Sequence, residues 1–379
     1  MTGKERIAAC CEHQNVDRPP VYHASISSRM ASLVIGREAY VGGGIQQFRE
    51  AVALWNGEAA HREFLERTRQ DTMDVTRALK VDMARVTYWR MPEKPARRID
   101  ERTFLYGDPD SAWRVMRFDP ESELYQTIDW RPCVQTTQQD LEDEVAQMER
   151  ALPNYAPTPE SYPDILAGLE AFGGTLAVPG TGVGIGVQFR SAAWIEMVAA
   201  RPDLIERWFD VQVERAIRDI RAQSTLDVQV MLGGGDMAAN QGPMYSPKSF
   251  RELLIPRLKR IVDECHAHGK YYFFASDGDL WPIADDLFPV VDGYYEIDRR
   301  AGMDLRLLRK RYPHLTLIGN ISSHTLHLGT REEVIEETLS CVEAAHEYGS
   351  IIIGCSNLIV SQTPEANFVA MLETLDRCR

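Results

Sequence analysis

The chain has 379 residues, of which 44% are hydrophobic and 26% charged. This is the usual mix of a soluble globular protein and excludes a disordered or collagen-like chain. The 42 basic and 56 acidic residues give a net charge of −14. Because the sequence has no long basic stripe, we expect no nucleic-acid partner. It also lacks an apolar signal core and a membrane-length apolar stretch, so we expect a cytoplasmic protein without a membrane partner.

The first half of the chain shows a mixed pattern of elements. Apolar periodicity predicts helices at 5–13, 44–56 and 59–79 and strands at 20–23 and 82–88. Alternating polar and apolar residues predict a small antiparallel sheet within 92–137, with strands at 97–100, 103–106 and 113–117. The four prolines of 153–163 predict a loop. We treat 92–163 as an excursion and loops within one domain that spans 1–379.

The second half alternates short apolar runs with long amphipathic segments. The predicted strands are 228–232, 270–274, 293–296, 316–318 and 350–353, and the predicted helices are 247–268, 280–287, 304–312, 330–348 and a closing helix from 364. Ser246 and Pro247 suit the N-cap and the first position of the helix at 247–268. About eight βα units can be counted along the chain, and such units predict parallel strands.

An α/β fold with a closed (β/α)8 TIM barrel is the architecture that these units predict, with a small antiparallel β excursion in the N-terminal half. The alternative is a doubly wound sheet, which would carry a glycine-rich phosphate turn after its first strand. Residues 20–28 contain no G-x-G-x-x-G. We therefore expect the barrel.

Catalytic groups of such barrels come from the carboxyl ends of the strands and the loops that follow. The polar residues at these places are His23, Trp89, Arg90, Asp236, Ser276, Asp277, Glu296, Asn320, Cys355, Ser356 and Asn357. We expect the catalytic residues to be Asp236, Asp277, Glu296 and His23. Carboxylates that converge with a histidine and an asparagine can transfer protons or hold a divalent cation.

Each of these residues also has a structural explanation. Asp236 follows three glycines and can cap a turn, although the glycines would also let a ligand approach the backbone closely. Asp277 precedes a glycine that suits positive φ in an Asx turn. Glu296 is followed closely by two arginines, so a surface ion pair is its alternative. A lone histidine after an apolar strand, such as His23, is more often a satisfied core or rim residue.

Five motifs occur in a fixed order along the chain: DRPP at 17–20, SPKSFRELLIPRLK at 246–259, GMDL at 302–305, IGNIS at 318–322 and TPEAN at 363–367. In this combination the sequence resembles the uroporphyrinogen decarboxylase superfamily of (β/α)8 barrels. The superfamily contains porphyrinogen decarboxylases and corrinoid-dependent methyltransferases, so the resemblance leaves the reaction open. True decarboxylases carry an M-R-Q-A-G-R segment after the first strand, whereas residues 22–30 read YHASISSRM. We therefore do not expect the haem-pathway reaction.

The resemblance also bears on cofactors and partners. Zinc methyltransferases of the family use an H-x-C pair and a late cysteine, at positions that match Ala275, Asp277 and Asn357, or Cys355 if the loop is shifted by two. The thiol-activating zinc site is therefore not reproduced. The metal ligands that remain for zinc or another ion are Asp277, Glu296 and Cys355. Cobalamin would be bound only by a separate corrinoid protein, because the sequence has no D-x-H-x-x-G. Family barrels often pair, which implies a homodimer.

Three hypotheses follow for the function. The first is a methyltransferase that demethylates a small O- or N-methylated substrate and passes the methyl group to the corrinoid partner. The second is a decarboxylase or lyase of a small carboxylated substrate, with Arg90 or Arg190 pairing the carboxylate. The third is an accessory barrel without catalysis. The residues expected to bind substrate are Trp89, Arg90, Arg190, Gln241, Trp281, Asn320 and Asn357.

Overall fold

A parallel sheet closes on itself in the computed structural model, which describes residues 1–86, 89–131, 137–189 and 191–379. Six strands form one ladder, in the order β13 (Ile351–Ile352), β12 (Thr316–Ile318), β11 (Gly293–Tyr295), β10 (Tyr271–Ala275), β7 (Val230–Gly234) and β6 (Gly180–Gly184). Two further segments complete the circle through the parallel bridges of Val21 with Ile353 and Met83 with Ala177. The Asp82 N–H joins these two segments by donating to the Val21 carbonyl at 2.8 Å.

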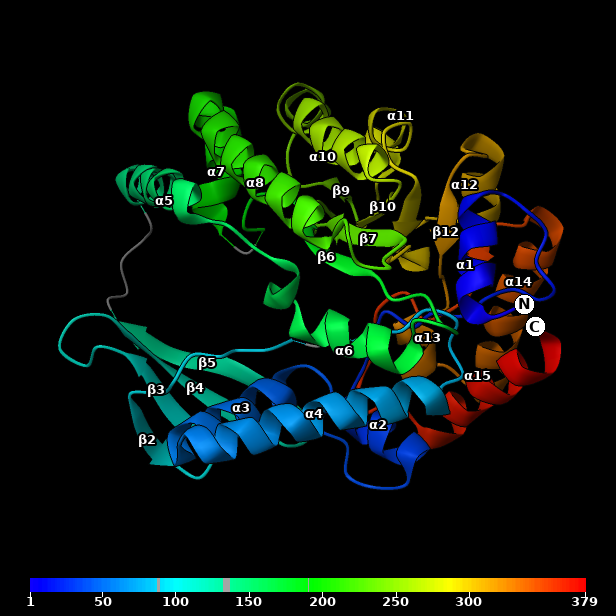
Figure 1. Ribbon diagram of the computed structural model, residues 1–379, viewed down its shortest axis with the longest axis horizontal. Coiled ribbons are helices and arrows are strands. Elements are labelled where there is room, and N and C mark those ends of the chain that lie inside the picture. The colour runs from blue at the N-terminus through cyan, green and yellow to red at the C-terminus, as the bar shows by residue number, and fades with distance from the viewer. Residues whose placement is uncertain (87–88, 132–136, 190) are drawn as a thin grey trace.

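The described residues therefore form a closed (β/α)8 barrel, as the sequence predicts. Its strands in chain order are the segments at 20–22 and 82–84, followed by β6, β7, β10, β11, β12 and β13 (Figure 1). Part of the predicted strand at 82–88 lies outside the described residues, which omit 87 and 88.

Apolar side chains fill the amino end of the barrel, and α1 (Gly3–Cys11) covers it. Ile7, Cys10 and Cys11 of α1 belong to one buried cluster with the strand residues Tyr22, Met83, Ala177, Val230, Phe273, Ile318 and Ile352. A capping box between Thr2 and Glu5 begins the helix. The filled amino end leaves the carboxyl ends of the strands as the face where a site can lie.

A buried carboxylate also ties the amino end together. The Asp82 side chain, 1% exposed, accepts hydrogen bonds from Arg6 Nη1 at 2.9 Å, from both Nη atoms of Arg18 at 2.9 Å and from Val21 N at 2.8 Å. These contacts join α1, the DRPP segment and the first two strands. Because two guanidinium groups face one carboxylate, its negative charge is compensated in the barrel wall.

The second half of the chain follows the predicted order of elements. The helices α10 (Ile255–Ala267), α11 (Ala284–Leu287), α12 (Leu305–Arg311), α14 (Arg331–Tyr348) and α15 (Glu365–Cys378) lie in predicted ranges, and α13 (Ser323–Leu328) adds a short turn. Ser246 caps α9 (Pro247–Ser249) by accepting from Ser249 N at 3.0 Å. The predicted helix at 247–268 contains a π-helical turn, Phe250–Leu254. Pro256 accounts for this turn, because it has no N–H to donate to the preceding turn.

The first half differs more from the prediction. After the first strand come α2 (Ser28–Ile35), α3 (Gly44–Asn56) and α4 (Glu58–Ala78), and the excursion contains β2 (Arg97–Asp100), β3 (Thr103–Gly107), β4 (Trp113–Asp119) and an additional strand, β5 (Leu124–Arg131). This sheet lies beside α3 (Figure 1) and packs on it through Phe104, Met116 and Tyr125. The predicted loop at 153–163 contains two short 3-10 turns.

The prediction also omits α5 (Gln138–Ala151), α6 (Pro163–Phe172), α7 (Ala192–Ala200), α8 (Pro202–Gln223) and β6. The sequence of β6, GTGVG, has neither the length nor the apolar content of a typical strand signal. Only pairing with β7 makes it a strand.

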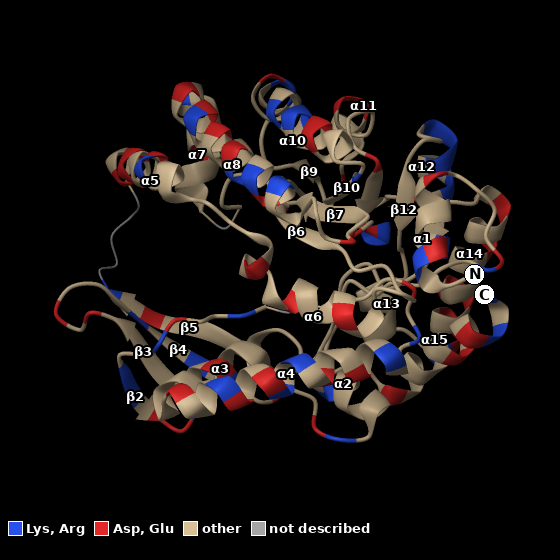
Figure 2. Cartoon of the chain, viewed as in Figure 1, with Lys and Arg blue, Asp and Glu red and all other residues tan. Residues whose placement is uncertain are grey.

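Acidic and basic side chains are interspersed along the outer helices, as Figure 2 shows for α4 and α8. None of the helices in the described part of the chain is both long enough and apolar enough to cross a membrane.

Candidate active site

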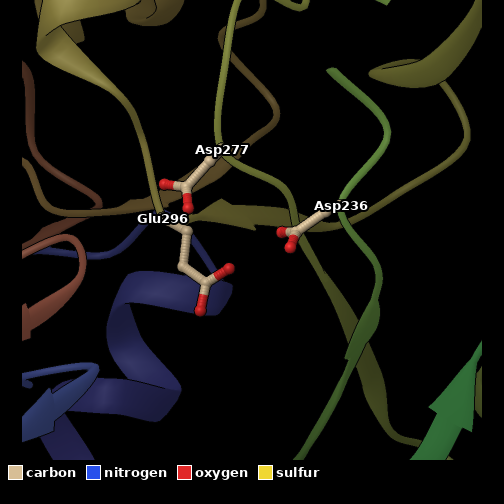
Figure 3. Close-up of side chains that lie close together, drawn as sticks. All are labelled: Asp236, Asp277 and Glu296. Atoms are coloured by element: carbon tan, nitrogen blue, oxygen red, sulfur yellow. The ribbon is translucent and has the colours of Figure 1, made fainter. Parts of the chain in front are cut away.

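Three acidic side chains meet at the carboxyl ends of three neighbouring strands. Asp236 follows β7, Asp277 follows β10 and Glu296 follows β11, and β10 pairs with both of the other strands. One carboxylate oxygen of each residue lies within 4.8 Å of the corresponding oxygens of the other two (Figure 3). We call these three residues the acidic cluster. The structure thus brings together three of the four residues that the sequence marks as catalytic.

Two of the glycines before the cluster lie so close to neighbouring protein atoms that a side chain would not fit. A Cβ at Gly233 would lie 2.5 Å from the Tyr272 hydroxyl, and one at Gly234, whose φ is +99°, would lie 2.4 Å from the backbone of Ala275. The close approach that Gly233 and Gly234 permit is between strands, and the approach of a ligand to the three glycines stays a prediction. Gly278, after Asp277, has the positive φ, +85°, that the sequence predicts.

The backbone at Glu296 adopts an unusual conformation. Its φ is +64°, in the left-handed region that a residue with a Cβ rarely enters and that costs about 1–3 kcal/mol. The surrounding barrel holds Glu296 there, and this conformation turns the chain away from β11 directly after the strand ends. Arg299, one of the two arginines expected as an ion-pair partner, instead donates to Asn320 Oδ1 at 3.1 Å.

Burial and mutual repulsion change the protonation of the cluster. Burial, followed by the charges of Asp277 and Asp236, raises the pKa of Glu296 to about 8, while Arg85 opposes the shift. Burial, followed by Asp236 and Asp298, raises the pKa of Asp277 to about 7, and a hydrogen bond from Asn357 opposes it. Near neutral pH these carboxyl groups can therefore hold protons and donate them.

Asn357 fixes the orientation of Asp277. Its Nδ2 donates to Asp277 Oδ2 at 2.7 Å, and its own Oδ1 accepts from Leu358 N at 2.6 Å. Leu358 begins β14 (Leu358–Ile359), which pairs in parallel with β1 (Ser25–Ile26). The sequence predicts that Asn357 contacts substrate, whereas the structure places it against a carboxylate of the acidic cluster.

His23 and Cys355 form a buried pair. His23 Nδ1 accepts from Cys355 N at 3.1 Å, so a neutral ring carries its proton on Nε2. Burial, followed by Arg379, lowers the pKa of His23 to about 4, and burial raises the pKa of the Cys355 thiol to about 12. Cys355 is thus a neutral thiol. Among the described residues, the group that could hold a metal comprises the acidic cluster without Cys355.

The remaining residues predicted to bind substrate lie in several places. Trp89 is half exposed, and Gln241 is exposed between β8 (Ala238–Ala239) and β9 (Gly242–Pro243). Arg90 Nε donates to the buried Glu50 of α3 at 2.8 Å, so Arg90 stabilises a charge in the protein. Arg190 lies outside the described residues.

Trp281 and Asn320 are also engaged by protein groups. The Trp281 indole N–H donates to the Gly302 carbonyl at 3.0 Å. Asn320 is buried, and its Nδ2 donates to the Met303 carbonyl at 3.0 Å. Their predicted contact with substrate remains a prediction.

Arg85 is the residue that sequence reasoning missed. It lines a cavity of about 140 Å³ with Tyr22, Thr181, Leu232 and Tyr295, and Tyr295 directly precedes Glu296 of the acidic cluster. The predicted strand at 82–88 runs through Arg85, and its last two residues lie outside the described residues. Pairing through Met83 and Ala84 makes Arg85 the first charged residue after the strand. Other strands of the barrel are short, and β11 has only three residues. A second strand of similar length would end just before Arg85, and this was the signal that could have indicated Arg85.

A closed barrel with a proton-holding acidic cluster at its carboxyl end defines a (β/α)8 protein with an enzyme-like site. The family model for uroporphyrinogen decarboxylase (URO-D) matches residues 186–378, which include all three residues of the cluster. The chain belongs to this family.

A solved structure shares the fold. A methyltransferase from Methanosarcina mazei has a TM-score of 0.62 and 16% sequence identity, over 100% of this chain and 99% of that chain. A sugar phosphate isomerase/epimerase from Parabacteroides distasonis is much less similar, with a TM-score of 0.31 and 9% identity over 63% of this chain and 87% of that chain. No curated protein matches the sequence.

Proposed function

We propose that this protein is a methyltransferase that removes a methyl group from a small O- or N-methylated substrate and passes it to the corrinoid of a separate protein. The observation that carries the proposal is the acidic cluster, in which Glu296 and Asp277 have pKa values of about 8 and about 7. Family membership supports it, as does the fold shared over the full length with a methyltransferase.

The cluster suits the departure of the demethylated group in such a reaction. When the methyl carbon is taken by the corrinoid, its bonding pair stays on the oxygen or nitrogen that leaves, and this atom needs a proton. Glu296 holds a proton near neutral pH and would donate it to that atom. Asp277, oriented by Asn357, would hold a second proton within the cluster. Asp236, Asp277 and Glu296 thus act together on the leaving atom.

The same three carboxylates fit a divalent cation. Their oxygens lie within 4.8 Å of one another, and an all-oxygen set suits Mg²⁺ or Mn²⁺. Zinc, the metal of the family's zinc methyltransferases, would bind here without a sulfur ligand from Cys355. A cation at this position would supply Lewis-acid polarisation of the leaving atom. Its binding requires that Asp277 and Glu296 release their protons.

A corrinoid partner is required because the reaction needs an acceptor for the methyl group. The sequence has no D-x-H-x-x-G motif, so a second protein would present the corrinoid over the barrel mouth. The homodimer and the cytoplasmic location remain predictions from the sequence.

Methyl transfer to cob(I)alamin tests the proposal. Under anaerobic conditions, a panel of methoxylated and N-methylated substrates is expected to remove the visible absorption of cob(I)alamin in the presence of this protein. Glu296→Gln is expected to slow the reaction about 100-fold or more, whereas Glu347→Gln on the exposed face of α14 leaves it unchanged. Absence of any spectral change over the whole panel, also with a purified corrinoid protein added, would refute methyl transfer.

A decarboxylase or lyase is the second candidate function, and Arg85 is the observation that favours it. A guanidinium beside an acid that holds a proton could bind a substrate carboxylate while Glu296 protonates the carbon that loses CO2. Release of CO2 from a carboxylated substrate without methyl transfer would favour this reading. Neither reaction, together with no cation bound at the cluster, would favour the accessory barrel.

A further inference from the structure

The cavity that Arg85 lines is inside the barrel. Tyr22, Leu232 and Tyr295 line it, and all three also belong to the cluster of side chains in the barrel interior or pack against it. Its lining residues come from the first four strands and from β11, with Ile165 of α6 at one side. Tyr295 directly precedes Glu296 of the acidic cluster in the chain.

Arg85 gives this cavity its charge. It is the one charged residue among those described that line the cavity. One of its Nη atoms donates to the neutral carbonyl of Ala24, which holds the side chain in place. Its charge acts on the carboxyl of Glu296 and on the phenols of Tyr22 and Tyr295. The guanidinium therefore lines the cavity and also acts electrostatically on the Glu296 carboxyl.

The cavity also limits the size of what it can hold. Its volume of about 140 Å³ is close to that of an engineered cavity of ~150 Å³ that binds benzene. Apolar side chains, including Val86, Ile165 and Leu232, form part of its wall. A ligand with a compact apolar body of about one ring and one anionic group would match both the wall and the charge.

We propose that Arg85 and this cavity form an anion subsite, and that the substrate is a small carboxylate whose carboxylate group binds Arg85 while its reacting atom faces the acidic cluster. A guanidinium presents parallel N–H donors that match a carboxylate. This inference rests on the proposed function in taking the acidic cluster as the reaction centre. Binding at the subsite, however, needs no turnover.

Calorimetric binding of benzoate and benzamide to the full-length protein tests the subsite. The two molecules have nearly the same shape and differ in charge. We expect benzoate to bind about 10- to 100-fold more tightly than benzamide. Arg85→Met is expected to abolish this preference, whereas Arg97→Met, on the exposed strand β2, retains it. Equal binding of the two ligands, or an unchanged preference in Arg85→Met, would overturn the proposal.

Two further measurements keep the result decisive if Arg85→Met does not fold. Leu232→Phe places a ring in the cavity without changing its charge, and it is expected to weaken benzoate binding at least about 10-fold. Inorganic phosphate is expected to compete poorly with benzoate, and tight phosphate binding that depends on Arg85 would overturn the assignment to a carboxylate.

The subsite and the proposed function can fail separately. Preferential benzoate binding without any methyl transfer would retain the subsite and refute the methyltransferase. Methyl transfer from neutral substrates alone, with no discrimination by charge, would refute the subsite and retain the methyltransferase.

Discussion

The two ends of the barrel both bury carboxylates, but their surroundings differ. At the amino end, Asp82 faces two guanidinium groups and a backbone N–H. At the carboxyl end, three carboxyl groups face one another, and repulsion adds to burial in raising the pKa of Glu296 to about 8. The first arrangement compensates charge and holds segments together. The second leaves acids that can exchange protons or bind a cation, which is the arrangement expected of a site.

Removing the charge of Asp82 should have the largest effect on stability. In Asp82→Asn the guanidinium groups of Arg6 and Arg18 lose the carboxylate that compensates them, so we expect the free energy of unfolding to fall by about 3–5 kcal/mol. Urea unfolding measures this change. The control is Asp376→Asn, whose exposed side chain pairs with Lys80 and which should change stability by less than about 0.5 kcal/mol. Equal effects of the two substitutions would contradict a compensated amino end.

The affinity of the acidic cluster for a cation should depend on pH. Because Asp277 and Glu296 must lose protons to serve as ligands, we expect Mn²⁺ to bind about 10- to 100-fold more tightly at pH 8.5 than at pH 6. Calorimetry at the two pH values measures the ratio, and Zn²⁺ and Mg²⁺ can be compared in the same way. Asp236→Asn should weaken binding at both pH values, whereas Glu347→Gln should not. An affinity independent of pH would show that these carboxyls are not the ligands.

Glu296→Gln should stabilise the protein at high pH, in contrast to Asp82→Asn. The pKa of Glu296 is raised from 4.5 to about 8, so between these values the folded state binds more protons than the unfolded state. Stability of the wild type therefore falls as pH rises through this window. At pH 9 the glutamine variant should melt about 2–5 °C higher than the wild type, and at pH 4 the two should coincide. A lower melting temperature of the variant at pH 9 would show that the Glu296 charge is compensated.

Asn357→Ala should have the smallest effect. The hydrogen bond from Asn357 lowers the pKa of Asp277, so its loss should raise that pKa further. The decline in reaction rate with rising pH, expected between about pH 7 and 8 in the wild type, should then move to higher pH by less than about one unit. A pH profile of the rate measures the shift, with exposed Asn154→Ala as the control. An unshifted profile would mean that Asp277 does not contribute to it.

The elements of the second half of the chain could be predicted from the sequence because their order is regular. Its strands β10, β11 and β12 follow one another with short helices between them, so the local alternation of apolar and amphipathic segments marks each unit. The positions of Asp277 and Glu296 after these strands could be predicted for the same reason. In the first half, the glycine-rich β6 carries little periodicity, and its strand state depends on pairing with β7.

Other features of the site depend on residues distant in sequence. The contact of Asn357 with Asp277 joins residues 80 positions apart, and no local pattern encodes it. The end of the second strand depends on its pairing with Val21 and Ala177, which is why the sequence marked Arg90 in place of Arg85. The expected single domain over 1–379 and the catalytic role of His23 stay predictions.

By itself, the sequence determined the βα alternation, the family motifs and the acids after β7, β10 and β11, because each depends on residues within one short segment. Only the tertiary structure decided that these acids meet, that the pKa values of Asp277 and Glu296 rise, and that Arg85 lines a cavity of the barrel. Proximity, burial and repulsion arise only when the barrel closes and brings separate strand ends to one face.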